Sequence, residues 1–192
     1  MKRVRTTFQM ALFCALTYAQ HADTNWYSSH EKNGVVFQNS YPKGGPYTGL
    51  TTEHFKHSYL VFYTRVVNTN EHPIDLALHF PAEAFPIPDS PTTFVKVLLP
   101  PDTMTLVKRD SMSYGLTSLA SLDGPSEFKR TLKAKEECLF YTVALFFQTQ
   151  EVFWEEARGG NRAEYLFDGK NVRFNMLPQI EALECGTVGF NP

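Results

Sequence analysis

The sequence predicts an all-β protein, an antiparallel β-sandwich of either immunoglobulin-like or jelly-roll topology. Residues 74–80 alternate strictly between apolar and polar side chains, which is the period of a half-buried strand. Residues 59–67 and 139–148 are apolar on both faces, as central strands are. No long amphipathic helix pattern interrupts these segments, so both topologies of an all-β sandwich remain open.

The remaining strands are expected between turn signals. Extended segments are predicted at 34–39, 94–99, 104–108 and 180–183, and a short helix is predicted near 114–122. Proline and glycine dominate residues 40–49, 85–91 and 100–101, which are typical of loops and crossovers.

Two hairpins are predicted from their turns. The polar segment 68–73 should join the strands at 59–67 and 74–80 into one hairpin. Asp168-Gly169 fits a two-residue type I′ turn between strands at 165–167 and 170–174. This second turn would place Glu164 opposite Arg173, where opposite charges help the ladder modestly.

The N-terminus has the pattern of a secretory signal. A basic start precedes a short apolar run at 8–19 and small residues suited to cleavage near 19–22. The run is too short for a permanent membrane span. We therefore expect residues 1–19 to be a signal peptide and 23–188 a single domain. Lipidation at Cys14 is an alternative, disfavoured by the bulky Phe13 before it.

Charge and length limit the partners. The chain has 192 residues and a formal net charge of −2. Cleavage near 19 would remove three basic residues and make the mature chain more acidic. A mildly acidic protein has no electrostatic attraction to nucleic acid. We expect a secreted, periplasmic or cell-surface protein with no transmembrane segment in its mature form and no nucleic-acid partner.

Cys138 and Cys185 are the cysteines left after cleavage. In an exported chain they are predicted to form one disulfide, which would stabilise the fold by about 4 kcal/mol. The alternative is a reactive thiol with a resolving partner. Neither cysteine lies in a C-x-x-C motif, so the structural bond is favoured.

No catalytic, metal or cofactor motif emerges. His54 and His57 have a spacing that faces opposite sides of a strand, so they are not expected to share a metal ion. Adjacent glutamates at 136–137 and 155–156 also divide between two strand faces. Nucleophile elbows, phosphate-binding loops and zinc-spaced cysteines are absent from the sequence. No cofactor or metal is predicted.

Aromatic residues in loops provide the best indication of a binding site. Exposed Tyr and Trp rings beside polar groups stack on sugars or anchor protein interfaces. The predicted ligand-binding residues are Tyr41, Tyr47, Trp154, Arg158 and Arg162. The alternative is that such rings, with Trp26, Tyr27 and Tyr114, cover the open ends of the sandwich.

Four stretches carry a family resemblance: YPKGG at 41–45, TRVVN at 64–68, LPPDTM at 99–104 and EECLFY at 136–141. Together they resemble a family of small secreted bacterial proteins, over most of the mature chain. The segment N-T-N-x-x-P at 68–73 is more loosely similar to bacterial immunoglobulin-like modules. The resemblance implies a secreted β-fold, and it implies no activity, ligand or catalytic residue.

These observations predict an exported, non-catalytic β-sandwich that binds a protein or glycan partner. A secreted polysaccharide hydrolase, with acids drawn from different strands, is one alternative. A structural or assembly component of the cell envelope is another. A flat aromatic face would favour binding, and a pocket with two carboxylates would favour the hydrolase.

Overall fold

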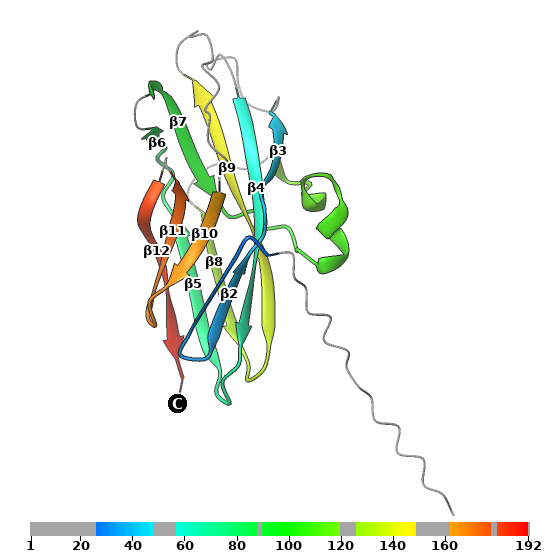
Figure 1. Cartoon of the computed structure of the whole chain (residues 1–192), viewed down its shortest axis with the longest axis vertical. Helices are drawn as coiled ribbons and strands as arrows, with labels where there is room; N and C mark the ends of the chain where they lie inside the picture. Colours follow the sequence, from blue (N-terminus) through cyan, green and yellow to red (C-terminus); the bar gives the residue numbers. More distant parts are fainter. Residues whose placement is uncertain are drawn as a thin grey trace, which may run out of the picture.

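Two antiparallel sheets form the protein in the computed structural model (Figure 1). The structure describes residues 26–47, 57–87, 90–119, 126–148, 162–177 and 180–191. The predicted signal peptide and Cys14 lie outside the described residues. None of the helices in the described part of the chain has the length and apolar character needed to span a bilayer.

The larger sheet has seven strands in the order β1-β2-β4-β9-β7-β6, and β3 also pairs with β4. Its strands are β1 (Ser28–Lys32), β2 (Val35–Asn39), β3 (Lys43–Pro46), β4 (His57–Asn68), β6 (Phe85–Ile87), β7 (Ser90–Leu98) and β9 (Glu137–Gln148). The smaller sheet has five strands in the order β10-β11-β12-β5-β8. Its strands are β5 (Ile74–Phe80), β8 (Ser126–Leu132), β10 (Arg162–Phe167), β11 (Asn171–Leu177) and β12 (Ile180–Phe190). The all-β, antiparallel prediction is confirmed.

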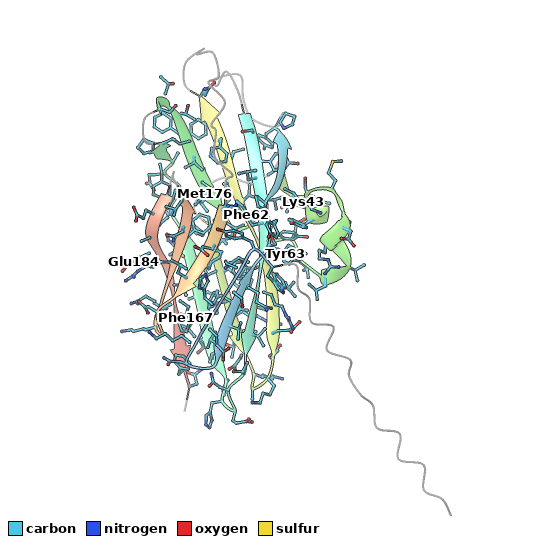
Figure 2. All side chains as sticks on the ribbon, in the orientation of Figure 1. Lys43, Phe62, Tyr63, Phe167, Met176 and Glu184 are labelled. Carbon is cyan, nitrogen blue, oxygen red and sulfur yellow. The ribbon has the colours of Figure 1, made fainter. Side chains whose placement is uncertain are left out.

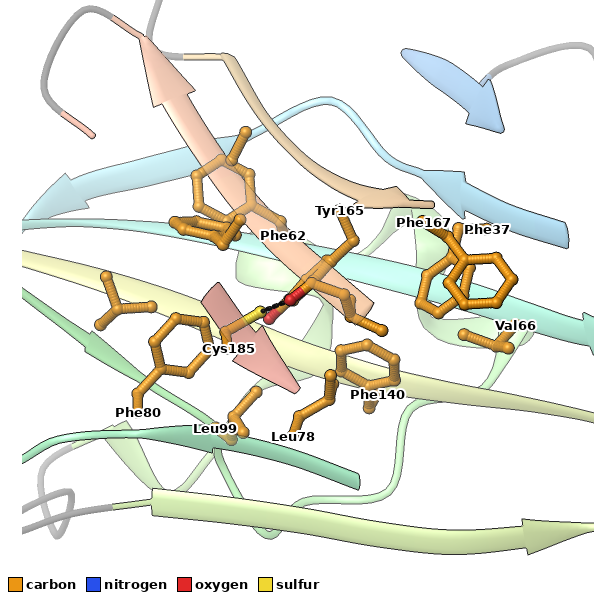
Figure 3. Close-up of a cluster of buried hydrophobic side chains, with 14 of the residues drawn as sticks. Phe37, Phe62, Val66, Leu78, Phe80, Leu99, Phe140, Tyr165, Phe167 and Cys185 are labelled. Atoms are coloured by element: carbon orange, nitrogen blue, oxygen red, sulfur yellow. Dashed lines mark hydrogen bonds between the residues drawn. The ribbon is translucent and has the colours of Figure 1, made fainter. Parts of the chain in front are cut away.

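The main core lies between the sheets, in a sandwich-like arrangement. The alternation predicted at 74–80 is confirmed, because the four apolar side chains of β5 are buried and Asp75 and His79 are exposed. Aromatic rings dominate the contact between the sheets. Phe80 packs against Phe174. Tyr165 packs against Phe140 (Figure 3). Such edge-to-face pairs add to the free energy gained by burying apolar area.

A second, smaller core lies on the outer face of the larger sheet. It contains the outward side chains Val61 and Tyr63 of β4 and Tyr141 and Val143 of β9. The segment between β7 and β8 covers them with Met104, Tyr114, Leu116 and Leu119. This cover explains why β4 and β9 are apolar on both faces. Each strand packs into one core on the inside and another on the outside.

The described part of this cover includes two short 3-10 helices, η1 (Leu106–Asp110) and η2 (Met112–Gly115). The prediction of an extended segment at 104–108 is therefore wrong. Of the helix expected at 114–122, Tyr114 and Gly115 lie in η2, residues 116–118 are not helical, and residues 120–122 lie outside the described residues. Met104 packs onto the neighbouring sheet without pairing with it, whereas Leu106 and Val107 are exposed, so the apolar residues of 104–108 do not mark a strand.

The predicted hairpin of 59–67 with 74–80 is not formed. β4 pairs with β2, β3 and β9, whereas β5 pairs with β12 and β8 in the other sheet. Asn68 directs this crossover, since its Nδ2 donates to the carbonyls of His72 at 2.8 Å and Lys133 at 2.9 Å. Pro73 has no N–H to continue a hairpin ladder.

The hairpin of β10 and β11 is present, but its register differs from the prediction. Glu164 lies opposite Asn175, and Leu166 opposite Arg173. The Asp168 carboxylate accepts the N–H groups of Lys170 at 3.0 Å and Asn171 at 2.8 Å. This Asx-type contact makes a longer loop than the type I′ turn and moves the register by two residues.

The predicted Cys138–Cys185 disulfide is wrong, because both thiols are free. Cys138 lies on β9 opposite Val66, in the larger sheet, and Cys185 lies on β12 in the smaller sheet. Packed sheets stand about 10 Å apart, whereas a disulfide needs Cα atoms within about 7 Å. Cys185 Sγ instead donates to the carbonyl of Val172 at 3.4 Å. Burial raises the pKa of each thiol to about 12.

One side of the molecule is closed by contacts between β1 and β2 of the larger sheet and the edge strand β10 of the smaller sheet. The Asn39 side chain of β2 bonds to both backbone groups of Tyr165 on β10, at 3.1 Å to N and 3.3 Å to O. His30 Nε2 of β1 lies 2.9 Å from Glu164 Oε2 of β10. We call these contacts the closed seam. Side chains there replace the hydrogen bonds that a neighbouring strand would otherwise make.

Candidate binding surface

Residues 105–116, which we call the covering loop, expose three large apolar side chains, of which Leu106 is 39% exposed. Val107 is 93% exposed and Met112 is 88% exposed, whereas Tyr114 in the same loop is 4% exposed. The loop projects to one side of the larger sheet (Figure 1). Single exposed apolar residues are common on protein surfaces. Val107 and Met112, however, are exposed in the same short loop, as apolar residues at interaction sites are. They are the strongest candidates for contact with another molecule.

The backbone of the covering loop is strained. Ser113 has φ 49°, Tyr114 φ 54° and Gly115 φ 66°, so three consecutive residues are left-handed. A non-glycine residue in this region costs about 1–2 kcal/mol. Such conformations persist when the surroundings determine them, and they are concentrated at functional sites.

Tyr114 is the residue that fixes this conformation. Its hydroxyl donates to the Tyr41 carbonyl at 2.6 Å, and its own carbonyl accepts from the Tyr141 hydroxyl at 2.7 Å. Its ring meets the edge of Tyr63 with centroids 4.8 Å apart. Burial raises the pKa of the Tyr114 hydroxyl and outweighs the opposing hydrogen bond to Ser40. The phenol therefore remains a neutral donor at physiological pH.

Lys43 on β3 connects the sheet to the covering loop (Figure 2). Its Nζ donates to the carbonyls of Arg109 at 2.7 Å and Ser111 at 3.0 Å. The same ammonium lies 4.2 Å from the centroid of the Tyr114 ring. Two charge-assisted hydrogen bonds and a cation–π contact thus hold the backbone between η1 and η2.

Asp102 precedes the covering loop and binds Thr117, the residue that follows it. Its Oδ1 accepts the N–H of Thr117 at 3.0 Å and the Thr117 hydroxyl at 2.7 Å. Burial acts to raise the pKa of Asp102, but hydrogen bonds from Ser118 and Thr117 outweigh it and the net pKa is lowered. Because the carboxylate is ionised at physiological pH, it can accept both of these hydrogen bonds from Thr117.

Tyr41 and Arg162, both predicted from the sequence, are brought together through a third residue. Tyr41 is 55% exposed, and its ring lies 5.7 Å from that of Tyr27. The Arg162 guanidinium lies 5.6 Å from the centroid of the Tyr27 ring. Since Tyr114 contacts the backbone of Tyr41, this group borders the covering loop.

Tyr47 does not join this group. It is only 7% exposed, and its hydroxyl donates to the Leu119 carbonyl at 3.1 Å. Its ring packs near that of Tyr59. Tyr47 is therefore a buried residue that packs beside Tyr59 of β4. Trp154 and Arg158 lie outside the described residues.

Val107, Met112 and Lys43 were not predicted as site residues. The sequence offered one signal for an exposed loop here. Apolar residues stand beside Lys108 and Arg109, in a segment that begins after Pro100-Pro101 and ends at Gly115. The role of Lys43 depends on a contact across more than sixty positions of sequence and leaves no local pattern.

The candidate surface offers contact rather than a set of reactive groups. Within the described residues, no group of three or more His, Cys, Asp or Glu side chains could hold a metal ion. The surface combines exposed aliphatic side chains, one exposed tyrosine and a basic pair at 108–109.

Comparisons of the chain with protein-family models, curated proteins and solved structures gave no match. The chain is therefore described by its architecture alone. It is an all-β protein of two antiparallel sheets that displays a rigidly held, apolar-tipped loop on the outer face of the larger sheet.

Proposed function

We propose that this protein is an exported, non-catalytic binding protein that engages a partner protein through the covering loop. The observation that carries the proposal is the exposure of Val107 and Met112 on a loop whose backbone is held by Lys43 and Tyr114. A held loop loses little conformational entropy on binding, so more of the contact energy becomes affinity.

The chemistry of the loop suits a protein partner. Methionine adapts to irregular apolar surfaces, and tyrosine and arginine are enriched at protein interfaces. Val107, Met112 and Tyr41 would supply the apolar centre. Lys108 and Arg109 would lie at the rim and favour a partner with acidic residues around an apolar patch.

For the fold, we propose the jelly-roll topology over the immunoglobulin-like one. The chain changes sheets at the connections β4–β5, β5–β6, β7–β8, β8–β9 and β9–β10. An immunoglobulin domain keeps its strand pairs D–E and F–G within one sheet each. Repeated alternation between two sheets is what paired Greek keys produce.

The proposal of export rests on the basic and apolar pattern of residues 1–19. The two free cysteines are compatible with an oxidising compartment, because burial keeps both thiols neutral.

A glycan is a second candidate ligand, favoured by one observation. Tyr41 exposes its ring beside Tyr27 and Arg162, which is the combination of a stacking face and polar donors that sugars use.

Site-specific photo-crosslinking would test the proposal. A photo-reactive residue at 107 or 112 should crosslink to a discrete protein in the cells that express this chain. The same residue at Leu177 or Phe190, which are 48% and 43% exposed on the smaller sheet, is the matched control. An excess of unlabelled protein should compete, and a Val107→Asp/Met112→Asp variant should compete about a hundredfold less well, because charge replaces two contact residues.

Equal crosslinking from the control positions would contradict the proposal, as would undiminished competition by the double variant. A glycan-array signal lost in both Tyr41→Ala and Arg162→Ala would support the second candidate instead.

A further inference from the structure

The two edges of the smaller sheet differ. The edge strand β10 is joined to β2 and β1 through the closed seam. The edge strand at the other end is β8, and among the strands that the structure describes only β5 pairs with it. Glu127, Lys129, Arg130 and Thr131 of β8 are all exposed. An open edge presents unpaired N–H and C=O groups to any strand of suitable chemistry.

The direction of the β8 backbone follows from the sheet register. Asn191 N–H donates to the Pro73 carbonyl at 3.2 Å, so odd-numbered residues of β5 face β12. Even-numbered residues of β5 therefore face β8 and pair with even-numbered residues there. The N–H and C=O groups of Glu127, Lys129 and Thr131 consequently point away from β5, towards the open edge.

The side chains on this edge are self-complementary. Glu127 and Lys129 share one face of the strand and form an ion pair with each other. Their side chains remain 57% and 73% exposed. In a two-fold antiparallel pairing centred on residue 128, each Glu127 would lie opposite a Lys129 of the second copy, and each pair would be a hydrogen-bonded one.

We propose that β8 is a contact between two copies of this chain, paired antiparallel about a two-fold axis at Phe128. The two smaller sheets would then become one continuous sheet. Four backbone hydrogen bonds would form between residues 127 and 129 of the two copies, with two ion pairs between the same residues. Phe128, which is half-buried against Phe140 with centroids 4.8 Å apart, would meet its symmetry mate on the inner face.

Charge selects this register over its neighbours. If the two-fold axis passed through Lys129, the two copies of Lys129 would lie opposite each other. If it passed through Arg130, the two copies of Arg130 would do so. Like charges directly opposite each other destabilise a ladder. Charged residues on an edge strand oppose pairing with arbitrary strands. The order of the charges along β8 favours one specific partner, which is a second copy of β8.

Sedimentation of the purified chain across concentrations tests this contact. We expect a reversible dimer with a dissociation constant of roughly 100 µM, since a single short edge buries little area. Glu127→Lys and Lys129→Glu should each weaken the dimer about tenfold, because like charges then lie opposite each other at both pairs. The double variant carrying both changes should restore wild-type affinity. Glu181→Lys, at an exposed site on β12, should have no effect.

A chain that stays monomeric at millimolar concentration would overturn the proposal. A dimer unaffected by either single variant, or not restored by the charge swap, would also overturn it. Protection of the amides of Glu127 and Lys129 from hydrogen exchange on raising the concentration would support it directly. The variants lie on the surface, and far-ultraviolet circular dichroism establishes that each is folded.

Discussion

Asn39 shows how much of this architecture depends on single side chains. It is 1% exposed at the end of β2, where the two sheets meet. Its Oδ1 accepts the N–H of Tyr165 and the hydroxyl of Thr64, each at 3.1 Å. Its Nδ2 donates to the carbonyl of Tyr165 and to the hydroxyl of Ser28. A side-chain amide thus takes the place of one peptide unit of a neighbouring strand.

Replacing Asn39 with alanine should destabilise the protein by about 3 kcal/mol. The substitution leaves the buried N–H and C=O groups of Tyr165 without partners, and such groups cost about 1–3 kcal/mol each to bury unpaired. Chemical denaturation measures the change in the free energy of unfolding.

Asn191→Ala is the matched control. The Asn191 side chain donates to Asp75 at the exposed end of β12, and its loss should change the free energy of unfolding by less than about 0.5 kcal/mol. Equal effects of the two variants would contradict the role assigned to Asn39.

The covering loop is the element on which the proposed function depends. Its strained residues carry no regular hydrogen-bond ladder, and contacts with β3, β4 and β9 hold it instead. The loop therefore has its own local stability, set by a few named contacts, and can open without unfolding the sheets.

Lys43→Met should loosen the covering loop while leaving the sheets folded. Removing two charge-assisted hydrogen bonds and a cation–π contact should favour local opening by about 2 kcal/mol, or roughly thirtyfold. Trypsin cuts after lysine and arginine, so cleavage at Lys108 and Arg109 should accelerate by a similar factor. Limited proteolysis followed by mass spectrometry measures it.

Lys170→Met is the control for this experiment, because Lys170 lies in the exposed turn between β10 and β11. Cleavage at 108–109 should be unchanged in that variant. An unchanged rate in Lys43→Met would show that Lys43 does not hold the loop.

At the scale of the whole molecule, both cores bury groups that are neutral at physiological pH. Burial raises the pKa of Cys138 and Cys185 from 9.0 to about 12. Burial also raises the pKa of Tyr114 and Tyr141, and raises that of Tyr165 further. All of these groups must lose a proton to become charged, and the fold disfavours that charge.

The protein should therefore lose stability in alkali. Above pH 9.0 the unfolded thiols ionise while the folded thiols stay protonated, so the unfolded state binds fewer protons and stability falls until about pH 12. Each thiol should remove about 1.4 kcal/mol at pH 10. Denaturant unfolding between pH 8 and pH 10.5 measures this loss.

A Cys138→Ala/Cys185→Ala variant should show a smaller loss of stability over the same pH interval. A free energy of unfolding that stays constant between pH 8 and pH 10.5 would contradict the burial of these thiols as neutral groups. Reducing agent should leave the melting temperature of the wild-type protein unchanged at pH 7, because the described thiols are not paired.

The candidate site was only partly predictable. Tyr41 and Arg162 were predicted as binding residues because aromatic and arginine residues in loops are recognisable from composition, and a binding role for them stays a prediction. Tyr47 shares that composition yet is buried, since exposure depends on whether another segment covers the ring. Val107 and Met112 were missed because an apolar side chain in sequence suggests a core position, and only the packed loop shows them facing outward.

The local sequence of this protein determined where its principal strands lie and which faces of them are apolar. The alternation in β5 and the two apolar faces of β9 express the strand period of two, which each segment carries by itself. Tertiary structure decided which strands pair, the register of β10 and β11, and whether the two cysteines meet. Each of these depends on contacts between residues distant in the chain, such as Asn68 with Lys133, and no local period encodes them.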